Sequence, residues 1–284
     1  FQRSTMVLYY NKDAFKEVGL DPEAPPTTWE ELAEYGQKLT NDGRYGVGIA
    51  LNSGSAQWAF TGFCLQNSTD GQNLMSEDGK SVYFNTPENV EALQFWLDLQ
   101  NEYKCMAEGI VQWTDLPTQF LAGEVAMIYH TTGNMANIHD NADFDFGTAF
   151  LPAHKRVGAP TGGGNFYISS NISEDRVQAA WKFIKFATST DRAAQWSLDT
   201  GYVATRQSCF DTDLIKDYYA EVPQASVAYE QLPYAKPELT TYNAAEIWRV
   251  LNDNIQAAVV GDMSAQEALD AAQEQAEEVL SEYQ

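Results

Sequence analysis

The sequence is poor in positive charge: 17 Lys and Arg residues stand against 40 Asp and Glu residues, for a formal net charge of −23 over 284 residues. A nucleic-acid interface needs Lys and Arg surfaces that displace counterions, so this balance argues against nucleic acid. Anionic membrane surfaces are disfavoured for the same reason. The acidity fits a protein kept soluble at the cell exterior, and it still permits one Arg to meet an anionic ligand.

Long apolar runs are also missing. No run approaches 18 residues, so the sequence predicts no membrane-spanning helix. The residues after Phe1 lack the basic segment and apolar core of a signal peptide. If the protein is exported, we expect its leader to be removed or to lie upstream, and any membrane attachment to be an upstream lipid anchor.

Cysteine is scarce, with Cys64, Cys105 and Cys209 as the full set. An odd number excludes complete internal pairing, and the spacing matches no metal motif. We expect each thiol to be a small buried side chain. A single disulfide stays open from the sequence.

Motifs for catalysis or cofactors are absent. The three histidines are scattered, and there is no H-E-x-x-H, G-x-S-x-G or P-loop. Gly162-Gly163-Gly164 lies outside any dinucleotide fingerprint, so it indicates a turn or a backbone open to a ligand. The many carboxylates show no spacing that singles out a glycosidase pair. We therefore predict no catalytic residue, metal or cofactor, with a glycoside hydrolase as the alternative from another class.

The local patterns that are present indicate alternating strands and helices. Residues 7–10 are typical of a buried strand, and residues 28–31 form a capping box that opens a helix to about residue 40. A second capping box begins at Ser264 with Glu267, and Thr86-Pro87 predicts another helix start. This alternation indicates α/β layering, and the length favours two compact units.

Several finer predictions concern the middle of the chain. We predict a strand over 45–51, a loop over 153–164, a strand over 165–170, and helices over 173–187 and up to residue 200. Helical spacing predicts that four tryptophans are core residues, namely Trp29, Trp96, Trp181 and Trp196.

The stretch "STMVLYYNKDAFKEVGLDPEAPPTTWEEL" resembles the family 1 extracellular solute-binding proteins of ATP-driven importers, especially members that take up glycerol 3-phosphate. The resemblance continues through "FLAGEVAMIYHTTGNMANI", "FGTAFLP", "GGGNFYISS", "AAWKFIKFATS", "TGYVATR" and "MSAQEALDAAQEQ", and so spans essentially the whole chain. It implies a two-lobed periplasmic-binding-protein fold of the type II, Venus-flytrap kind. It also implies a location at the extracellular face or in the periplasm.

In that family about a hundred residues of the first lobe precede the "YYNKD" strand, so we expect this chain to be a fragment of a longer precursor. The resemblance assigns 5–157 and 206–284 to the second lobe, and 1–4 and 158–205 to a remnant of the first lobe. We then expect residues 158–205 of the remnant to expose apolar surface or to pair with something else. Hinges are expected near residues 4–5, 156–160 and 204–206.

The resemblance also implies a function and its partners. We expect the protein to bind glycerol 3-phosphate or a glycerophosphodiester between the lobes, and to present it to the membrane subunits of an ABC importer. A sugar or oligosaccharide is the alternative ligand. The implied ligand contacts are Ser4, Thr131, Gly163, Tyr202 and Arg249. Arg offers a planar fork of donors for phosphate, and hydroxyl and backbone N–H groups add uncharged donors.

Each contact residue also fits a plainer role: Ser4 near the chain end, Thr131 as a helix cap, Gly163 as a turn, Tyr202 as core, and Arg249 as a partner of a surface carboxylate. Thr131 stands where the relatives have Ser, which keeps the hydroxyl. Trp58 is a further ligand candidate because Trp often stacks on the solute in this family, and it fits helix core equally well. Tyr242 and Trp248 lie beside Arg249 and supply aromatic faces suited to sugar C–H groups or choline.

Overall fold

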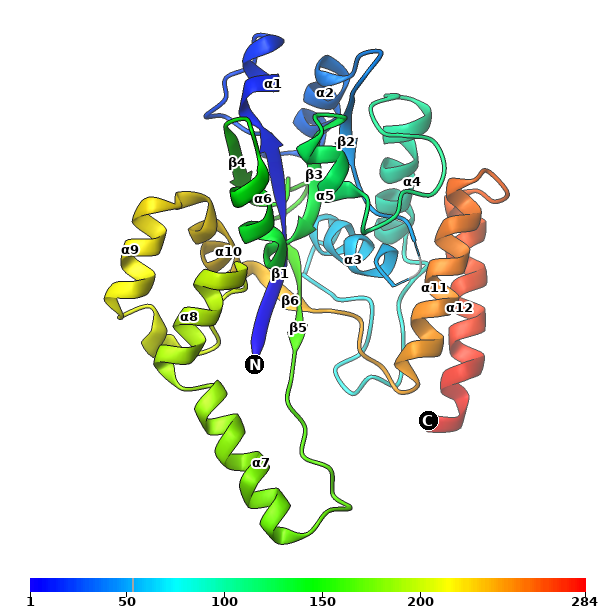
Figure 1. Cartoon of the computed structure of the whole chain (residues 1–284). Coiled ribbons are helices and arrows are strands. Elements are labelled where there is room, and N and C mark those ends of the chain that lie inside the picture. Colours follow the sequence, from blue (N-terminus) through cyan, green and yellow to red (C-terminus); the bar gives the residue numbers. More distant parts are fainter. Residues whose placement is uncertain (53) are drawn as a thin grey trace.

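One long central strand organises the fold. The structure, a computed structural model, describes residues 1–52 and 54–284. The strand β1 (Gln2–Asn11) pairs antiparallel with β3 (Val125–Thr131) and β4 (Phe146–Ala149) through its second half. Its first residues pair antiparallel with β5 (Ala159–Gly164) instead. As a result β1 belongs to two sets of strands that meet near Thr5 and Met6 (Figure 1).

Two parallel pairings complete this sheet within the described residues. The strand β2 (Tyr45–Gly48) runs beside β3, and β6 (Ala235–Pro237) runs beside β5. The order is therefore β2-β3-β1-β5-β6, with β4 also on β1. The mixture of parallel and antiparallel pairs with surrounding helices confirms the predicted α/β class.

Helices surround the sheet. In chain order they are α1 (Lys12–Glu17), α2 (Trp29–Leu39), α3 (Ala56–Asn67), α4 (Pro87–Asn101), α5 (Leu116–Leu121), α6 (Met135–Asn141), α7 (Glu174–Ala187), α8 (Thr190–Thr200), α9 (Asp213–Glu221), α10 (Ser226–Gln231), α11 (Ala244–Val259) and α12 (Ala265–Leu280). In Figure 1, α11 and α12 lie together at one side of the molecule, and α8, α9 and α10 lie at the other. The α7 helix extends away from the body of the chain (Figure 1).

The core lies on both faces of β1. Met6, Leu8 and Tyr10 join one apolar cluster, while Val7 and Tyr9 join another. Successive side chains of a strand point to opposite faces, which explains this division. All five side chains are buried. The predicted buried strand is thus confirmed as a central strand covered on both sides.

The predicted helix starts are confirmed. Thr28 accepts a hydrogen bond from the Glu31 amide at 3.1 Å, and the Glu31 carboxylate accepts from the Thr28 amide at 3.3 Å. Ser264 and Glu267 form the same reciprocal pair at the start of α12. Thr86 caps α4. These side chains satisfy amides that the first helical turn leaves without partners.

One loop prediction and one strand prediction are wrong, and another predicted strand is shorter than expected. Residues 159–164, predicted as loop, form β5, while residues 165–170, predicted as strand, are irregular. The pairing of Gln2 with Gly164 through Thr5 with Thr161 gives 159–164 a hydrogen-bonded partner, whereas 165–170 pair with no strand in the described part of the chain. Within 45–51, only Tyr45–Gly48 are strand, because the pairing with β3 ends at Gly48.

The tryptophan prediction is right for two positions and wrong for two. Trp29 and Trp96 are buried, but Trp181 is 49% exposed and Trp196 is 36% exposed. Nothing in α7 is buried, and Phe183 beside Trp181 is 57% exposed. The apolar stripe of α7 is covered by no other element among the described residues, and on α8 the small residues Ala193 and Ala194 are buried while Trp196 lies at the edge of the packed face. Helical spacing alone therefore does not bury these tryptophans.

The three cysteines, Cys64, Cys105 and Cys209, are buried free thiols, which confirms that each is a small buried side chain. The disulfide that the sequence left open is therefore not formed among them. Burial raises the pKa of the Cys105 thiol to about 12. Among the described helices, none combines the length and the apolar character needed to cross a membrane.

Candidate functional site

A cavity of about 400 Å³ lies where β1, β5 and α3 meet. This volume is within the usual range for a small-molecule site. The residues that line it are Gln2, Ser4, Asn52, Gly54, Ser55, Gln57, Trp58, Trp113, Thr131, Gly162, Gly163, Tyr202, Glu238 and Trp248. Five of the six predicted ligand residues are in this set, and Arg249 is outside it.

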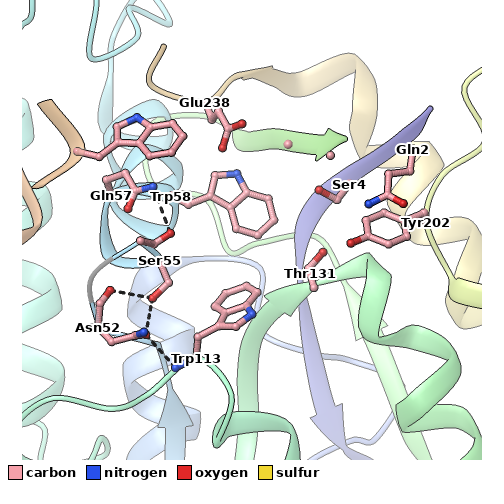
Figure 2. A pocket seen from close by; sticks show the side chains of 14 residues that line it. Gln2, Ser4, Asn52, Ser55, Gln57, Trp58, Trp113, Thr131, Tyr202 and Glu238 are labelled. Atoms are coloured by element: carbon pink, nitrogen blue, oxygen red, sulfur yellow. Dashed lines mark hydrogen bonds between the residues drawn. The ribbon is translucent and has the colours of Figure 1, made fainter. Parts of the chain in front are cut away.

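One side of the cavity is polar. Ser4 lies in β1, Thr131 ends β3, Gly163 lies in β5, and Tyr202 follows α8. These segments are far apart in sequence. The register of β1 brings them together, since β1 pairs Met6 with Thr131 on one neighbour and residues 2–5 with β5 on the other. Figure 2 shows Ser4, Thr131 and Tyr202 on the same side of the hollow.

Two glycines permit this close approach. Gly163 has φ +128°, and a Cβ atom there would lie 2.1 Å from the carbonyl oxygen of Gln2. At Gly133, a Cβ atom would lie 2.5 Å from Cζ of Tyr202. Tyr202 therefore packs directly on the backbone of the turn after β3, and the β5 backbone lies open to the cavity beside Ser4.

The hydroxyl groups keep capacity for a ligand. Thr131 Oγ1 accepts a hydrogen bond from the Gly133 amide at 3.2 Å, so the predicted cap role is present. The Thr131 O–H proton is still available to donate. The phenol hydroxyl of Tyr202 has no hydrogen-bond partner in the described ranges, because the bonds of this residue involve its backbone.

The opposite side is aromatic. Trp58 on α3 lies with its ring centroid 5.7 Å from that of Trp113. Trp248 on α11 donates from its ring nitrogen to the Leu239 carbonyl at 2.6 Å. Trp58 is 8% exposed and its ring nitrogen is buried without a partner among the described atoms. The helix-core and cavity roles of Trp58 therefore coexist.

Trp113 is fixed from two directions. Its amide donates to Asn52 Oδ1 at 2.8 Å, and its ring stacks on His130 with centroids 3.9 Å apart. Burial lowers the pKa of His130 to about 4, so the imidazole is neutral at physiological pH. A neutral ring stacked under Trp113 supports the aromatic wall without adding charge to it.

Glu238 is the one charged side chain among the described residues that line the cavity. It follows β6, and its amide donates to the Thr161 carbonyl at 3.2 Å. Burial raises the pKa of its carboxyl group. Sequence reasoning missed Glu238 and Trp113, because each follows a segment with no recognisable motif and reaches the cavity only through tertiary packing.

Arg249 lies on the exposed face of α11. Its guanidinium pairs with Glu246 at 2.6 Å and with Asp253 at 2.7 Å. This arrangement corresponds to the surface-pair alternative, although its neighbour Trp248 does line the cavity. Tyr242 is 48% exposed and stacks on Tyr283, outside the lining set.

The site is built to hold a molecule by hydrogen bonds and aromatic contact. No cluster of three or more potential metal ligands exists in the described parts of the chain. The described lining residues contain no Cys or His nucleophile or base. The hydroxyl and backbone groups can donate hydrogen bonds to a polar organic solute, the carboxylate can accept them, and the indole faces provide apolar surface.

The chain matches the family model described as bacterial extracellular solute-binding protein over residues 1–224. It is 31% identical to the sn-glycerol-3-phosphate-binding periplasmic protein UgpB of Salmonella paratyphi A, covering 100% of this chain and 67% of the relative. The UgpB protein of Escherichia coli K12 is 30% identical with the same coverage. The chain therefore spans about two thirds of the length of these relatives.

Solved structures agree with this match. UgpB from Mycobacterium tuberculosis in complex with glycerophosphocholine superposes with a TM-score of 0.87 at 27% identity, covering 100% of this chain and 70% of that chain. The cyclic alpha-maltosyl-1,6-maltose binding protein of Arthrobacter globiformis gives 0.81 at 26% identity, covering 99% and 71%. Maltose-bound MalE3 of T. maritima gives 0.85 at 24% identity, covering 98% and 71%, and so supports the fold.

The predicted family and two-lobed fold are confirmed by these matches. The chain therefore belongs to the bacterial extracellular solute-binding proteins, the substrate-binding components of ABC importers that work outside the cytoplasmic membrane.

Proposed function

We propose that this protein captures glycerol 3-phosphate or a glycerophosphodiester in its cavity and presents it unaltered to the membrane subunits of an ABC importer. The names of the UgpB relatives and the glycerophosphocholine complex of the similar structure support this ligand class. The observation that carries the proposal is the convergence of Ser4, Thr131, Gly163 and Tyr202 on one side of one cavity.

These groups suit a phosphate ester. Each phosphate oxygen accepts hydrogen bonds, and Ser4, Thr131 and Tyr202 supply hydroxyl donors that face the same hollow (Figure 2). The lack of side chains at Gly162 and Gly163 lets the ligand reach the β5 backbone. Uncharged donors of this kind hold an anion without requiring a basic surface, which this acidic chain lacks.

We propose that Arg249 adds the charged contact. Its present partners, Glu246 and Asp253, are exposed side chains on the same helix. Exposed ion pairs are weak, so a desolvated phosphate is a competitive partner for the guanidinium fork. Arg249 follows Trp248, which lines the cavity, so binding a ligand requires the guanidinium to leave both carboxylates and turn toward the cavity.

The cavity would lie between two lobes. We propose that 5–157 and 206–284 form the second lobe, and that 1–4 and 158–205 belong to the first. The change of partners along β1 near Thr5 supports this division. The exposed apolar side chains of α7 and α8 support it as well, because a first-lobe remnant without its remaining strands exposes such a surface.

A sugar is the second candidate ligand. Trp58, Trp113 and Trp248 present indole faces, which suit the C–H faces of sugars. The maltosyl-maltose binding protein of Arthrobacter globiformis is similar over 99% of this chain. Sugar hydrolysis is disfavoured, because glycosidases generally use two carboxyl groups and Glu238 is the one carboxylate among the described lining residues.

Isothermal titration calorimetry on the full polypeptide tests the proposal with glycerol 3-phosphate, glycerophosphocholine and maltose. We expect at least one phosphate ligand to bind and maltose not to bind. Arg249→Ala should weaken phosphate-ligand binding by about tenfold or more, since it removes a bidentate charged contact. Arg176→Ala, at an exposed position on α7, is the matched control and should leave affinity unchanged.

Tight maltose binding with neither phosphate ligand bound would overturn the proposal in favour of the sugar. Equal affinities for wild type and Arg249→Ala would remove Arg249 from the site while leaving the ligand class intact. Release of free sugar from an oligosaccharide would show an enzyme instead.

A further inference from the structure

The two sides of the cavity differ in chemistry. Figure 2 shows Trp58 and Glu238 on one side of the hollow and Ser4, Thr131 and Tyr202 on the other. The hydroxyl side suits an anion, whereas the indole and carboxylate side does not. A ligand that fills about 400 Å³ would touch both.

The aromatic side is held in place by contacts that do not depend on a ligand. Trp113 stacks on His130 at 3.9 Å, and the Trp248 ring nitrogen bonds the Leu239 carbonyl at 2.6 Å. Because Leu239 directly follows Glu238, that bond also ties Trp248 to the carboxylate's own segment. The Glu238 amide bonds Thr161 of β5 at 3.2 Å. The wall is therefore preorganised, which lowers the entropy cost of binding.

Glu238 lacks a positive partner. No hydrogen bond or ion pair joins its carboxylate to another group in residues 1–52 and 54–284. The side chain is partly buried, and burial is the cause that raises its pKa. A carboxylate removed from water without a partner is unfavourable, so a cation that reaches it restores lost interaction energy.

We propose that Glu238 with Trp58, Trp113 and Trp248 forms a subsite for the positively charged alkylammonium end of the ligand. This inference rests on the proposed function and narrows its ligand class to zwitterionic glycerophosphodiesters. Indole faces attract quaternary ammonium groups through the ring quadrupole, and an adjacent carboxylate adds opposite charge. The phosphate of the same molecule faces the hydroxyl side, near Ser4 and Tyr202, and the guanidinium contact proposed for Arg249 would approach that phosphate from α11.

The same geometry disfavours glycerol 3-phosphate. That ligand carries negative charge and no cation, so it leaves Glu238 unpaired and places like charges in one cavity. Glycerophosphocholine instead carries a phosphate that the hydroxyl side can bind and a quaternary ammonium group that the Glu238 carboxylate can pair with. The discrimination resides in Glu238, because the hydroxyl side treats both phosphates alike.

Calorimetry with glycerophosphocholine and glycerol 3-phosphate tests this subsite on wild type and Glu238→Gln. The amide keeps the shape of the side chain and removes its charge. We expect wild type to prefer glycerophosphocholine, and Glu238→Gln to lose about tenfold or more of that affinity. Affinity for glycerol 3-phosphate should stay the same or rise. Glu221→Gln, an exposed carboxylate on α9, makes the same charge change away from the cavity and should alter neither affinity.

The outcomes separate the two proposals. If both phosphate ligands bind wild type equally and Glu238→Gln changes neither affinity, the cationic subsite is wrong and the proposed function stands. A parallel loss of affinity for both ligands in Glu238→Gln would also overturn the subsite, because it would show a structural role. If wild type binds neither phosphate ligand but binds maltose, the proposed function itself fails. The subsite is supported if Glu238→Gln loses affinity for glycerophosphocholine and keeps its affinity for glycerol 3-phosphate.

Discussion

Replacing Gly163 by Ala should destabilise the junction between β1 and β5. Gly163 pairs with Arg3 in the antiparallel ladder and adopts φ +128°, a region that L residues avoid. A Cβ atom built there lies 2.1 Å from the Gln2 carbonyl oxygen, which is backbone and cannot rotate away. The substitution therefore adds backbone strain and forces the two strands apart.

The magnitude follows from these two effects. A non-glycine residue at positive φ costs about 1–2 kcal/mol. Separating the strands weakens one or two ladder hydrogen bonds, each contributing about 0.5–1.5 kcal/mol. Together they lower the free energy of unfolding by about 1.5–5 kcal/mol. At about 2.1 cal/mol/K of unfolding entropy per residue, this lowers Tm by roughly 3–8 °C for a chain of this size.

The matched control is Gly164→Ala, one residue further along β5. A Cβ atom at Gly164 meets only the flexible side chain of Gln2, at 3.5 Å, which is ordinary contact. Thermal unfolding followed by circular dichroism compares both variants with wild type. A Tm for Gly163→Ala that matches Gly164→Ala would refute the reasoning, because it would show that the strand junction adjusts without cost.

Two further predictions concern the helix cap and the apolar face of the remnant. Hydrogen bonds from Thr27 and Thr28 lower the pKa of Glu31, so its stabilising effect is complete above the unfolded pKa and is lost as pH falls through the folded value. In urea unfolding, wild type should therefore have a higher free energy of unfolding than Glu31→Gln at pH 7, and the two values should converge below about pH 4. A difference that does not change with pH would contradict this role of the Glu31 carboxylate. On α7, Trp181→Ser with Phe183→Ser should reduce fluorescence of an apolar dye while changing stability little, because both side chains are exposed; unchanged dye binding would contradict an accessible apolar face.

Sequence reasoning succeeded where the determinants are local. The capping box at Thr28 and Glu31 depends on residues three apart, and the structure shows both of its hydrogen bonds. Residues 7–10 are apolar on both strand faces, which requires a central position in a sheet. Such patterns are complete within a short stretch, so no knowledge of the rest of the fold is needed.

It failed where pairing partners decide the outcome. A run of glycines has little strand preference, yet 162–164 are strand because β1 supplies hydrogen bonds to them. Helical spacing assigned Trp181 to the core, but an apolar stripe is buried only when another element covers it. For the site, resemblance identified Ser4, Thr131 and Tyr202, whereas Glu238 follows no motif and becomes notable only through its unpaired, partly buried carboxylate.

The strand junction also links binding to lobe closure in the proposed division. Thr5 donates to the Pro160 carbonyl at 2.9 Å, and Gln231 donates to the Met6 carbonyl at 2.8 Å, so the crossing point is tied to both sides. A ligand shifts an open–closed equilibrium only by its difference in affinity for the two states.

Contacts within one lobe are present in both states and supply affinity without driving closure. By the proposed boundaries, Thr131 and Glu238 lie in the second lobe, while Gly163 and Tyr202 lie in the first. The hydroxyl side of the cavity therefore already joins both lobes, because Thr131 and Tyr202 face the same hollow from different lobes. A phosphate that bonds both hydroxyl groups favours closure by these contacts, and a zwitterion that also reaches Glu238 adds a further contact across the boundary between the lobes.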